Sequence, residues 1–483
     1  MRQAYKTAFL IICLPAFTGG CMTINPKQGF SDVAETVKVR IGKRVHWQLE
    51  AEEKRAAQAD LKTLLARPLT PSRAVQIALL NNRDLQATYA DLGIAQAAVV
   101  QARLVKNPVL DGAVTWFNDA GGTPNLAFGV AWNFIDLLQR PLRKAVAESE
   151  FEEAKYRVAR RVIALAADTH AAFIDYVANA QEVELFSQVV RSARATAKAA
   201  EALRKAGNIT ALQFDQQQSF LTRAKLEIAQ AEGRQTEARE RLNVLMGLTG
   251  AETKWRAPKR LPDVPAHRLN TRNMERRAVQ HSLEIAAVRQ RLITLGRRFR
   301  LVKKQSLIPN LEVGAEFERE VEVEDGEKNL REAFGPTFEL EIPIFDRGQA
   351  RRAGAAFQIK KAEDELWALA VRVRSAARLA RARLLMTRKT AAYYSSTILP
   401  ESRRILTGTQ RDYNAMQQSI FQLVTAKRQQ ILAGREFIQA RRGYWAAHVR
   451  FQQILSGALP EGGGGETMEV ASPGNGGADE GEH

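Results

Sequence analysis

The sequence is poor in cysteine, proline and aromatic residues, and it has no long apolar run after its N-terminal segment. Its 483 residues include 2 cysteines, 16 prolines and 7% aromatic residues. Because 18 or more consecutive apolar residues are missing, no transmembrane helix is expected beyond that segment. Few aromatic residues together with long stretches of Ala, Gln, Glu and Arg favour extended helices over several globular cores. We therefore expect a mainly α-helical chain.

Motifs of catalysis and of nucleic-acid binding are also missing. There is no HExxH, no CxxC, no nucleophile elbow and no phosphate-binding glycine loop, and the six histidines are scattered. We therefore expect no enzymatic activity, no cofactor and no metal site. The formal net charge of +18 would favour a polyanion. However, Lys and Arg are spread along helical stretches without interleaved aromatic residues, so no nucleic-acid partner is expected.

The N-terminal segment has the layout of a secretory signal. Basic residues lie within positions 1–6, an apolar core occupies 8–17, and small residues precede Cys21. We predict a signal peptide over residues 1–20. The segment resembles a bacterial lipoprotein signal, and this resemblance implies lipidation of Cys21, although Thr18 stands where that pattern has leucine. The exported chain would keep one cysteine and form no internal disulfide.

Two stretches in the second half alternate with the period of two that is typical of a β-strand. Residues 311–318 and 337–342 place apolar side chains on one face and mainly acidic side chains on the other. The acidic residues are Glu312, Glu316, Glu318, Glu339 and Glu341. Asp325-Gly326 supplies a turn, which predicts one hairpin at 309–343. A second hairpin is predicted at 108–134, around a loop rich in Gly and Pro.

The acidic face of the predicted hairpin cannot lie in a dry core. A barrel with lipid outside and water inside would satisfy both faces, and the five glutamates would then line its lumen. A half-exposed sheet on a soluble domain has the same pattern, so the residues alone leave both possibilities open. Two hairpins supply four strands, too few to close a barrel, and open edges are not tolerated in lipid. A membrane barrel would therefore have to be shared between several chains.

Long helices are predicted between and after the hairpins. Thr70-Pro71 opens a helix that is expected to run through Asn82 to Lys106. From Leu142 to Ala206 the sequence contains neither Gly nor Pro, and apolar residues recur there at alternating steps of four and three. That spacing predicts coiled-coil packing. Pro400 falls within a long helix of the second half, which we expect to be kinked or jointed there.

The order helix, hairpin, long helix, break, helix occurs twice and predicts a tandem repeat. Thr210 and Ser419, like Gly247 and Gly457, lie about 210 residues apart. The predicted parts are a signal peptide (1–20), an N-terminal lead-in or equatorial segment (21–68), a first repeat (69–250), a linker (251–270), a second repeat (271–458) and a disordered tail (459–483). The predicted fold class is mainly α with a small β part, in which long coiled-coil helices accompany four strands.

This combination of repeat, hairpins and export signal resembles the TolC-like outer-membrane efflux protein family. The resemblance covers about Leu69 to Gly457, and it rests on the order and spacing of motifs at 207–215, 245–247, 309–311 and 340–348. It implies a homotrimer whose twelve strands close one shared barrel, continued by an α-helical tube across the periplasm. The acidic residues named above would face the polar lumen.

The resemblance also implies a function. The chain would be the passive outer-membrane exit duct of a tripartite efflux system for small toxic compounds or ions, with a periplasmic adaptor and an inner-membrane transporter as partners. It would lie in outer-membrane lipid, span into the periplasm and be lipid-anchored. The duct of a type I protein-secretion system has the same architecture and is an alternative. A periplasmic coiled-coil scaffold is a further alternative, which leaves the hairpins and the export signal unexplained.

Members of the family narrow the far end of the helical tube to an aperture that acidic residues often line. Matching that region to this sequence places Gln422 and Thr425 where carboxylates are expected, and brings Gln213 and Asp215 to the corresponding part of the first repeat. These four residues are the candidates for the aperture. The departure from carboxylates weakens the expectation of a cation-binding ring, and polar surface at a helix break is the alternative.

Overall fold

The computed structural model describes residues 25, 27–116, 124–265, 272–324 and 327–460, except for the side chains of 321–328. The predicted signal peptide, Cys21, the Asp325-Gly326 turn and nearly all of the predicted tail lie outside the described residues. The described chain is mainly α-helical and contains a four-stranded sheet. The predicted fold class, mainly α with four strands per chain, is confirmed.

The helices and strands follow one another in two similar series. The first series is α2 (Phe30–Ile41), α3 (Ala51–Leu65), α4 (Pro71–Asn81), α5 (Arg83–Arg103), β1 (Val109–Thr115), β2 (Asn125–Asn133), α6 (Phe134–Lys205), α7 (Ala211–Met246) and the 3₁₀ turn η2 (Gly250–Thr253). The second is α8 (Met274–His281), α9 (Leu283–Gln305), β3 (Leu311–Glu324), β4 (Glu327–Leu340), α10 (Gln349–Tyr393), the π-helical turn η3 (Tyr394–Ile398), α11 (Leu399–Asn414) and α12 (Ile420–Leu455). Among the helices so described, none has both the length and the apolar composition needed to cross a membrane.

The chain forms two compact units, each assembled from separated parts of the sequence. The first unit contains the described parts of Met1–Glu35, Ala87–Val158 and Ile285–Ala368. The second contains those of Thr36–Gln86, Ala159–Glu284 and Leu369–His483. Each unit therefore draws on both halves of the chain. The compact units do not coincide with the predicted repeats, and the division into repeats stays a prediction.

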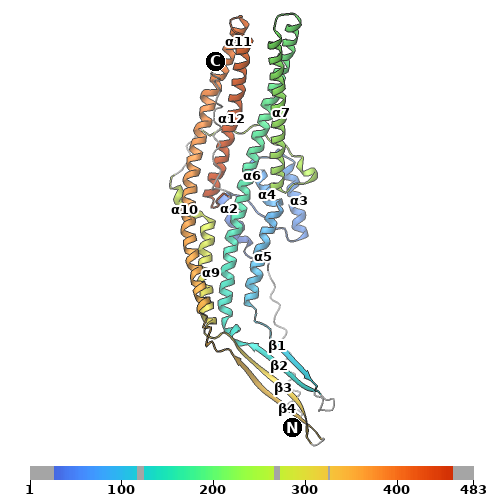
Figure 1. Cartoon of the computed structure of the whole chain (residues 1–483), viewed down its shortest axis with the longest axis vertical. Coiled ribbons are helices and arrows are strands. Elements are labelled where there is room, and N and C mark those ends of the chain that lie inside the picture. The colour runs from blue at the N-terminus through green and yellow to red at the C-terminus, as the bar shows by residue number, and fades with distance from the viewer. Residues whose placement is uncertain (1–24, 26, 117–123, 266–271, 325–326, 461–483) are drawn as a thin grey trace, which may run out of the picture. The chain divides into compact units, whose positions relative to one another are not determined.

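The sheet belongs to the first unit, and its strands pair in chain order. Every neighbouring pair is antiparallel, as Figure 1 shows for β1 to β4. Phe128 of β2 lies opposite Phe317 of β3, and Glu312 of β3 lies opposite Glu339 of β4. Because directly opposed residues of antiparallel strands share a face, the register assigns each side chain to one face. Within the described chain, β1 and β4 are the edge strands.

Helix α6 contains a proline near its start. It starts at Phe134, directly after β2, and runs through Pro141 to Lys205. The N–H of Asp136 donates to Oδ1 of Asn133 (2.9 Å), which satisfies one of the free N–H groups at the helix start. Proline removes one helical hydrogen bond but does not end the helix here. The helix therefore begins upstream of the stretch without Gly and Pro, which starts at Leu142.

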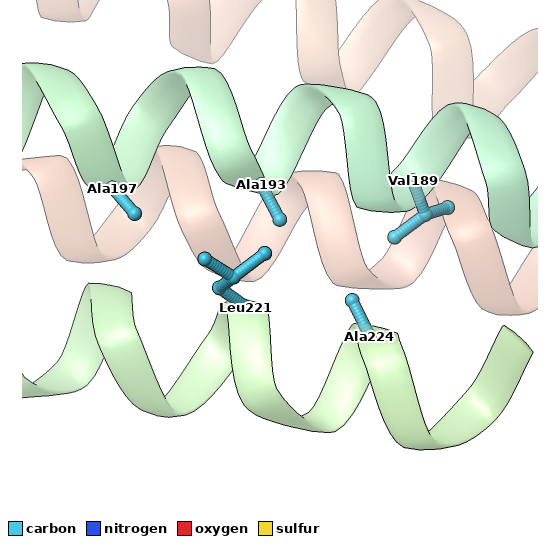
Figure 2. Packing of buried hydrophobic residues seen from close by; sticks show 5 residues of the cluster. All are labelled: Val189, Ala193, Ala197, Leu221 and Ala224. Carbon is cyan, nitrogen blue, oxygen red and sulfur yellow. The ribbon is translucent and has the colours of Figure 1, made fainter. Parts of the chain in front are cut away.

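The predicted apolar stripe of α6 is buried, and its coiled-coil packing stays a prediction. From Val158 to Ala200 the residues at alternating steps of four and three are buried or half-buried, and none of them is exposed. Part of this stripe packs against α7, where the cluster shown in Figure 2 brings small and branched apolar side chains of the two helices together. The cluster consists of Val189, Ala193 and Ala197 of α6 with Leu221 and Ala224 of α7. Alanine at three of five positions lets the two helices approach closely.

The helix predicted from Thr70 to Lys106 is two helices instead of one. The backbone leaves the helical region at Asn82, where ψ is 122°, and α5 then runs to Arg103. Oδ1 of Asn82 accepts from the N–H of Leu85 (2.8 Å), and its Nδ2 donates to the carbonyl of Leu245 (3.0 Å). The side chain thus caps α5 and binds the end of α7, a long-range role that local helix propensity does not reveal. Ser282, with ψ 119°, makes the same break between α8 and α9.

Helices α7 and α12 of the second unit each end beside one of these breaks, at a glycine with positive φ. Gly247 follows α7 with φ 67°, and Gly457 follows α12 with φ 99°. A Cβ on Gly247 would lie 2.7 Å from the carbonyl oxygen of Asn81, and one on Gly457 would overlap the carbonyl oxygen of His281. The carbonyl of Gly457 accepts from the N–H of Leu283 (2.9 Å). This twofold arrangement supports the proposed tandem repeat.

The long helix of the second half is interrupted where Pro400 predicts a joint. Helix α10 ends at Tyr393, the turn η3 follows, and Pro400 lies in the first turn of α11. Proline has no N–H to offer to the carbonyl four residues earlier, so the helix widens into a π turn before it. The expected joint at Pro400 is confirmed.

Candidate functional site

Carboxylates gather on one face of the sheet, which we call the acidic face. The register places side chains from β1, β3 and β4 on it: Asp111, Glu312, Glu316, Glu318, Glu320 and Glu339. The four predicted glutamates that lie within strands therefore share a face. Glu341 lies one residue beyond β4, where its N–H donates to the carbonyl of Asn310 (3.2 Å). That these residues line a barrel lumen stays a prediction.

The arrangement of the acidic face requires water. Glu312 and Glu339 lie directly opposite one another, a pairing of like charges that destabilises a sheet unless solvent screens it. Gly129 lies between Asp111 and Glu316 and pairs with both. A Cβ on Gly129 would lie 2.6 Å from both carboxylate oxygens of Asp111, so the missing side chain leaves room for the carboxylate. Burying such charges without partners would cost far more than the sheet could supply.

Two residues of the acidic face, Asp111 and Glu320, are missing from the sequence-based candidates. Asp111 lies in the edge strand β1, where it pairs with Gly129 of β2, and Glu320 lies opposite Arg331. The signal for Asp111 is the alternation of Leu110 and Val114 with polar positions in β1, which is shorter and weaker than that in β3. Glu320 simply continues the alternation of β3 beyond Glu318.

The opposite face of the sheet is mainly apolar and is uncovered in a single chain. Leu110, Phe334 and Phe338 are 81%, 71% and 81% exposed, respectively. The register places all three on the face opposite the acidic one. Large apolar side chains clustered in this way are uncommon on the surface of a soluble monomer and mark contact with a partner or with lipid. One face of the sheet therefore requires water and the other an apolar covering.

The second unit contains two helical hairpins whose tips are built alike. At the first tip, the N–H of Asn208 donates to the carbonyl of Leu203 (2.9 Å), and Gly207 has φ 74°. At the second, the N–H of Gln417 donates to the carbonyl of Asp412 (2.8 Å), and Met416 has φ 59°. This six-residue closure is the Schellman ending of α6 and of α11. Met416 thus takes the left-handed position that glycine occupies at the first tip.

Gln213 and Gln422 cap the helices that begin at these tips. Oε1 of Gln213 accepts from the N–H of Thr210 (2.9 Å), and Oε1 of Gln422 accepts from the N–H of Ser419 (3.0 Å). Both are the third-residue partner of a capping box. This local role was not part of the prediction, although the spacing Thr-x-x-Gln and Ser-x-x-Gln signals it.

The other two aperture candidates lie in the second turns of the same helices. Asp215 is exposed, and Oγ1 of Thr425, which is also exposed, donates to the carbonyl of Phe421 (2.8 Å). No hydrogen bond joins Gln213 or Asp215 to Gln422 or Thr425 in the described part of the chain. A single chain therefore places the four candidates near two helix starts without joining them, and their role in an aperture stays a prediction.

The two roles of Gln422 can be separated by substitution. Gln422→Ala removes the capping partner and is expected to destabilise the start of α12 by about 1 kcal/mol, whereas Gln422→Glu keeps an acceptor there. Hydrogen exchange at the N–H groups of Ser419 and of the first turn of α12 measures the effect. Faster exchange in Gln422→Ala alone is the expected result, and equal exchange in both variants would contradict the capping role.

The described residues offer no metal centre. No group of three or more His, Cys, Asp or Glu side chains within the described ranges is placed to hold a metal ion. The described histidines are His46, His170, His281 and His448, and the other two lie outside the described residues. What the described chain does offer is a sheet with one acidic and one apolar face and a pair of capped helical hairpins.

Comparison with known proteins shows a similarity to outer membrane efflux proteins. Residues 74–248 match the family model described as outer membrane efflux protein. Over 356 residues the chain is 26% identical to the cobalt-zinc-cadmium resistance protein CzcC of Cupriavidus metallidurans, and the match covers 72% of this chain and 79% of that protein. The chain is therefore similar to the outer membrane efflux protein family over these residues. It is located in the outer membrane and takes part in efflux.

Solved structures of membrane proteins share the fold of the chain. A membrane protein from Pseudomonas aeruginosa matches with a TM-score of 0.65 at 18% identity, over 80% of this chain and 93% of that one. The CmeC outer membrane channel of Campylobacter jejuni matches with a TM-score of 0.67 at 13% identity, over 81% and 86% of the two chains. At such identities the likeness shows the fold, which here combines the four-stranded sheet with the long helices.

Proposed function

We propose that this protein is the exit duct of a tripartite efflux system, built from three copies of the chain. The sheet is the observation that most strongly supports this proposal, because it has two edge strands, an acidic face and an uncovered apolar face within one chain. In a bilayer, unpaired strand edges are not tolerated, so the edges of β1 and β4 must pair with neighbouring copies. Three sheets of four strands would close a twelve-stranded barrel with the apolar face toward lipid.

The acidic face then becomes the lining of a water-filled lumen. Glu312, Glu316, Glu318, Glu339 and Glu341, joined by Asp111, would give the lumen a negative potential that favours cations. The relative named as a cobalt-zinc-cadmium resistance protein supports small divalent metal ions as cargo. We therefore propose that metal cations are among the solutes that the duct conducts.

The duct would act passively and would catalyse no reaction. Its energy would come from an inner-membrane transporter, linked to it by a periplasmic adaptor. The long helices would continue the lumen across the periplasm, and the hairpin tips would form its far end, with Gln213, Asp215, Gln422 and Thr425 at the aperture. The paired construction of the two tips supports this placement, because three copies would then present six similar helix starts around one axis.

Conductance in planar bilayers tests the duct. The purified full-length protein is expected to give discrete conductance steps and to prefer cations over anions. Neutralising Glu312 and Glu339 together, as Glu312→Gln with Glu339→Gln, is expected to lower the cation-to-anion permeability ratio at least about twofold, because six carboxylates per trimer disappear from the lumen. Reversal potentials in a salt gradient measure the ratio.

Glu332→Gln is the matched control for this experiment. Glu332 also lies in β4, but it pairs with Arg319 and belongs to the opposite face. The control is expected to leave the ratio unchanged. A ratio that responds to Glu332→Gln and not to the double variant would assign the faces the other way round and would contradict the proposed lumen. A cross-linked trimer that stays silent, even when Gln422→Ala widens the proposed aperture, would contradict the duct itself.

A further inference from the structure

The second unit contains a cleft of about 1040 Å³ that the proposed duct does not use. Apolar side chains form most of its lining. Helix α6 supplies Ile163, Phe173 and Ile174, and α12 supplies Trp445 and Val449. A volume of this order with a mainly apolar wall is typical of a site for a small organic molecule.

The polar part of the cleft is cationic. Arg40, Lys43, Arg260 and Arg277 line it, and none of the described residues that line it is Asp or Glu. Arg260 pairs with Glu184 (3.4 Å) outside the lining. Arg277 is exposed and makes no ion pair with the described part of the chain. The cleft thus carries an excess of positive charge that its own lining does not neutralise.

Backbone carbonyls hold two of these cations in place. Nη1 of Arg40 donates to the carbonyl of Ser456 (2.9 Å) and to that of His281. Nζ of Lys43 donates to the carbonyl of Ser72 (3.0 Å) and to its hydroxyl. Burial lowers the pKa of Lys43 because no carboxylate offsets the loss of water around its charge. An anion in the cleft would supply the missing counter-charge.

A buried amide adds a hydrogen-bond donor. Gln453 is 3% exposed and lines the cleft. Its Oε1 accepts from Nη1 of Arg450 (3.0 Å), which fixes the orientation of the amide. Its Nε2 has no hydrogen-bond partner among the described residues. A buried donor without an acceptor is costly, so a ligand oxygen in the cleft would remove that cost.

His170 completes the polar part of the lining as a neutral group. Burial, together with the nearby His448 and Lys43, lowers its pKa to about 4. At neutral pH its imidazole is therefore uncharged and can donate one N–H. The cleft combines fixed cations, neutral donors and a broad apolar wall.

We propose that this cleft binds an amphiphilic anion, in which a carboxylate or phosphate head group contacts Lys43, Arg277 and Nε2 of Gln453 while one apolar chain lies against α6 and α12. The charge complementarity selects an anion over a neutral or cationic molecule of the same size. The apolar wall selects an amphiphile over inorganic phosphate, which would leave that wall without a partner. Such a ligand is available either as a free fatty acid or as an anionic lipid.

Fluorescence energy transfer from Trp445, which lines the cleft, provides the test. The full-length protein in nanodiscs of phosphatidylcholine is titrated with dansyl-undecanoic acid. Saturable binding of the acid, with binding of its methyl ester at least about tenfold weaker, is the expected result, because the ester keeps the chain and loses the charge. Equal binding of acid and ester would overturn the proposal.

Arg277→Ala and Arg276→Ala form a matched pair in α8. Both side chains are exposed, but only Arg277 lines the cleft. Arg277→Ala is expected to weaken binding of the acid about tenfold, the loss of one charge-assisted contact, and Arg276→Ala to leave it unchanged. Equal effects of the two substitutions would show a diffuse surface attraction and would overturn the proposal. Trp445→Phe is expected to reduce the energy transfer without abolishing displacement by unlabelled ligand.

Competition distinguishes the two sources of ligand and the other possible occupants. Displacement of the probe by lauric acid alone assigns the site to free fatty acids, and displacement by a short-chain phosphatidic acid assigns it to anionic lipid. Failure of both would overturn the proposal.

Residues 461–483 contain six acidic residues and no Lys or Arg. If the full-length protein binds no probe and a variant ending at Pro460 does, the chain's own acidic segment is the occupant and the proposal falls.

Discussion

Replacing Gly457 by alanine is expected to destabilise the second unit by about 3 kcal/mol or more. Gly457 has φ 99°, a conformation that L side chains rarely adopt, and a Cβ there would overlap the carbonyl oxygen of His281. That oxygen cannot easily move, because it belongs to the backbone at the end of α8 and accepts from Arg40. Backbone strain and steric overlap therefore add. The unfolding midpoint of the purified protein, followed by circular dichroism in detergent, measures the loss.

Gly233→Ala is the control for this prediction. Gly233 lies within α7, and a Cβ there would meet nothing within 4 Å. Alanine is a better helix former than glycine, so this variant is expected to be as stable as the original or more stable by up to about 1 kcal/mol. Equal midpoints for the two alanine variants would contradict the close contact between the end of α12 and the α8 to α9 break.

Phe338→Arg is expected to abolish most of the assembled trimer that is found in the outer membrane. Phe338 is 81% exposed in one chain, so few contacts within the chain depend on it. In the proposed barrel it faces lipid, where an arginine costs up to about 2–4 kcal/mol per chain depending on its depth in the bilayer, and the trimer carries three. Flotation of membranes on a density gradient, with trimer detected on unboiled gels, measures the effect.

Glu339→Arg tests the same strand on its other face. Glu339 follows Phe338 in the chain and lies opposite Glu312. In the proposed lumen the arginine would remain in water and would pair with that glutamate, so the variant is expected to assemble normally and to conduct cations less selectively. Loss of assembly in Glu339→Arg, with normal assembly in Phe338→Arg, would reverse the assignment of the two faces.

The faces of the sheet were predictable because the signal is local. Alternation with a period of two assigns a side chain to a face without any knowledge of the partner strand, and Glu312 and Glu339 fall opposite one another as members of one face. The buried stripe of α6 was predictable for the same reason, since steps of four and three mark one side of a helix. Asp111 was not predicted as part of the acidic face because β1 is short and its alternation includes a glycine.

The remaining features depend on contacts between distant parts of the chain. The sequence around Asn82 does not indicate that its amide binds the carbonyl of Leu245, and that contact fixes the break between α4 and α5. The cleft of the second unit is likewise built from segments that are far apart in sequence, such as those around Lys43 and Gln453. Helix propensity and periodicity carry no information about such pairings.

The two hairpin tips of one chain are not energetically equivalent. At the first, Gly207 accepts its left-handed conformation without penalty; at the second, Met416 holds φ 59° with its side chain 96% exposed. A residue with a Cβ in that region is strained by roughly 1 kcal/mol, which corresponds to about a fivefold change in an equilibrium constant. Any rearrangement that unwinds a hairpin end would therefore begin preferentially at Met416. In a trimer, the tip between α11 and α12 of each copy would then open more easily than the tip between α6 and α7.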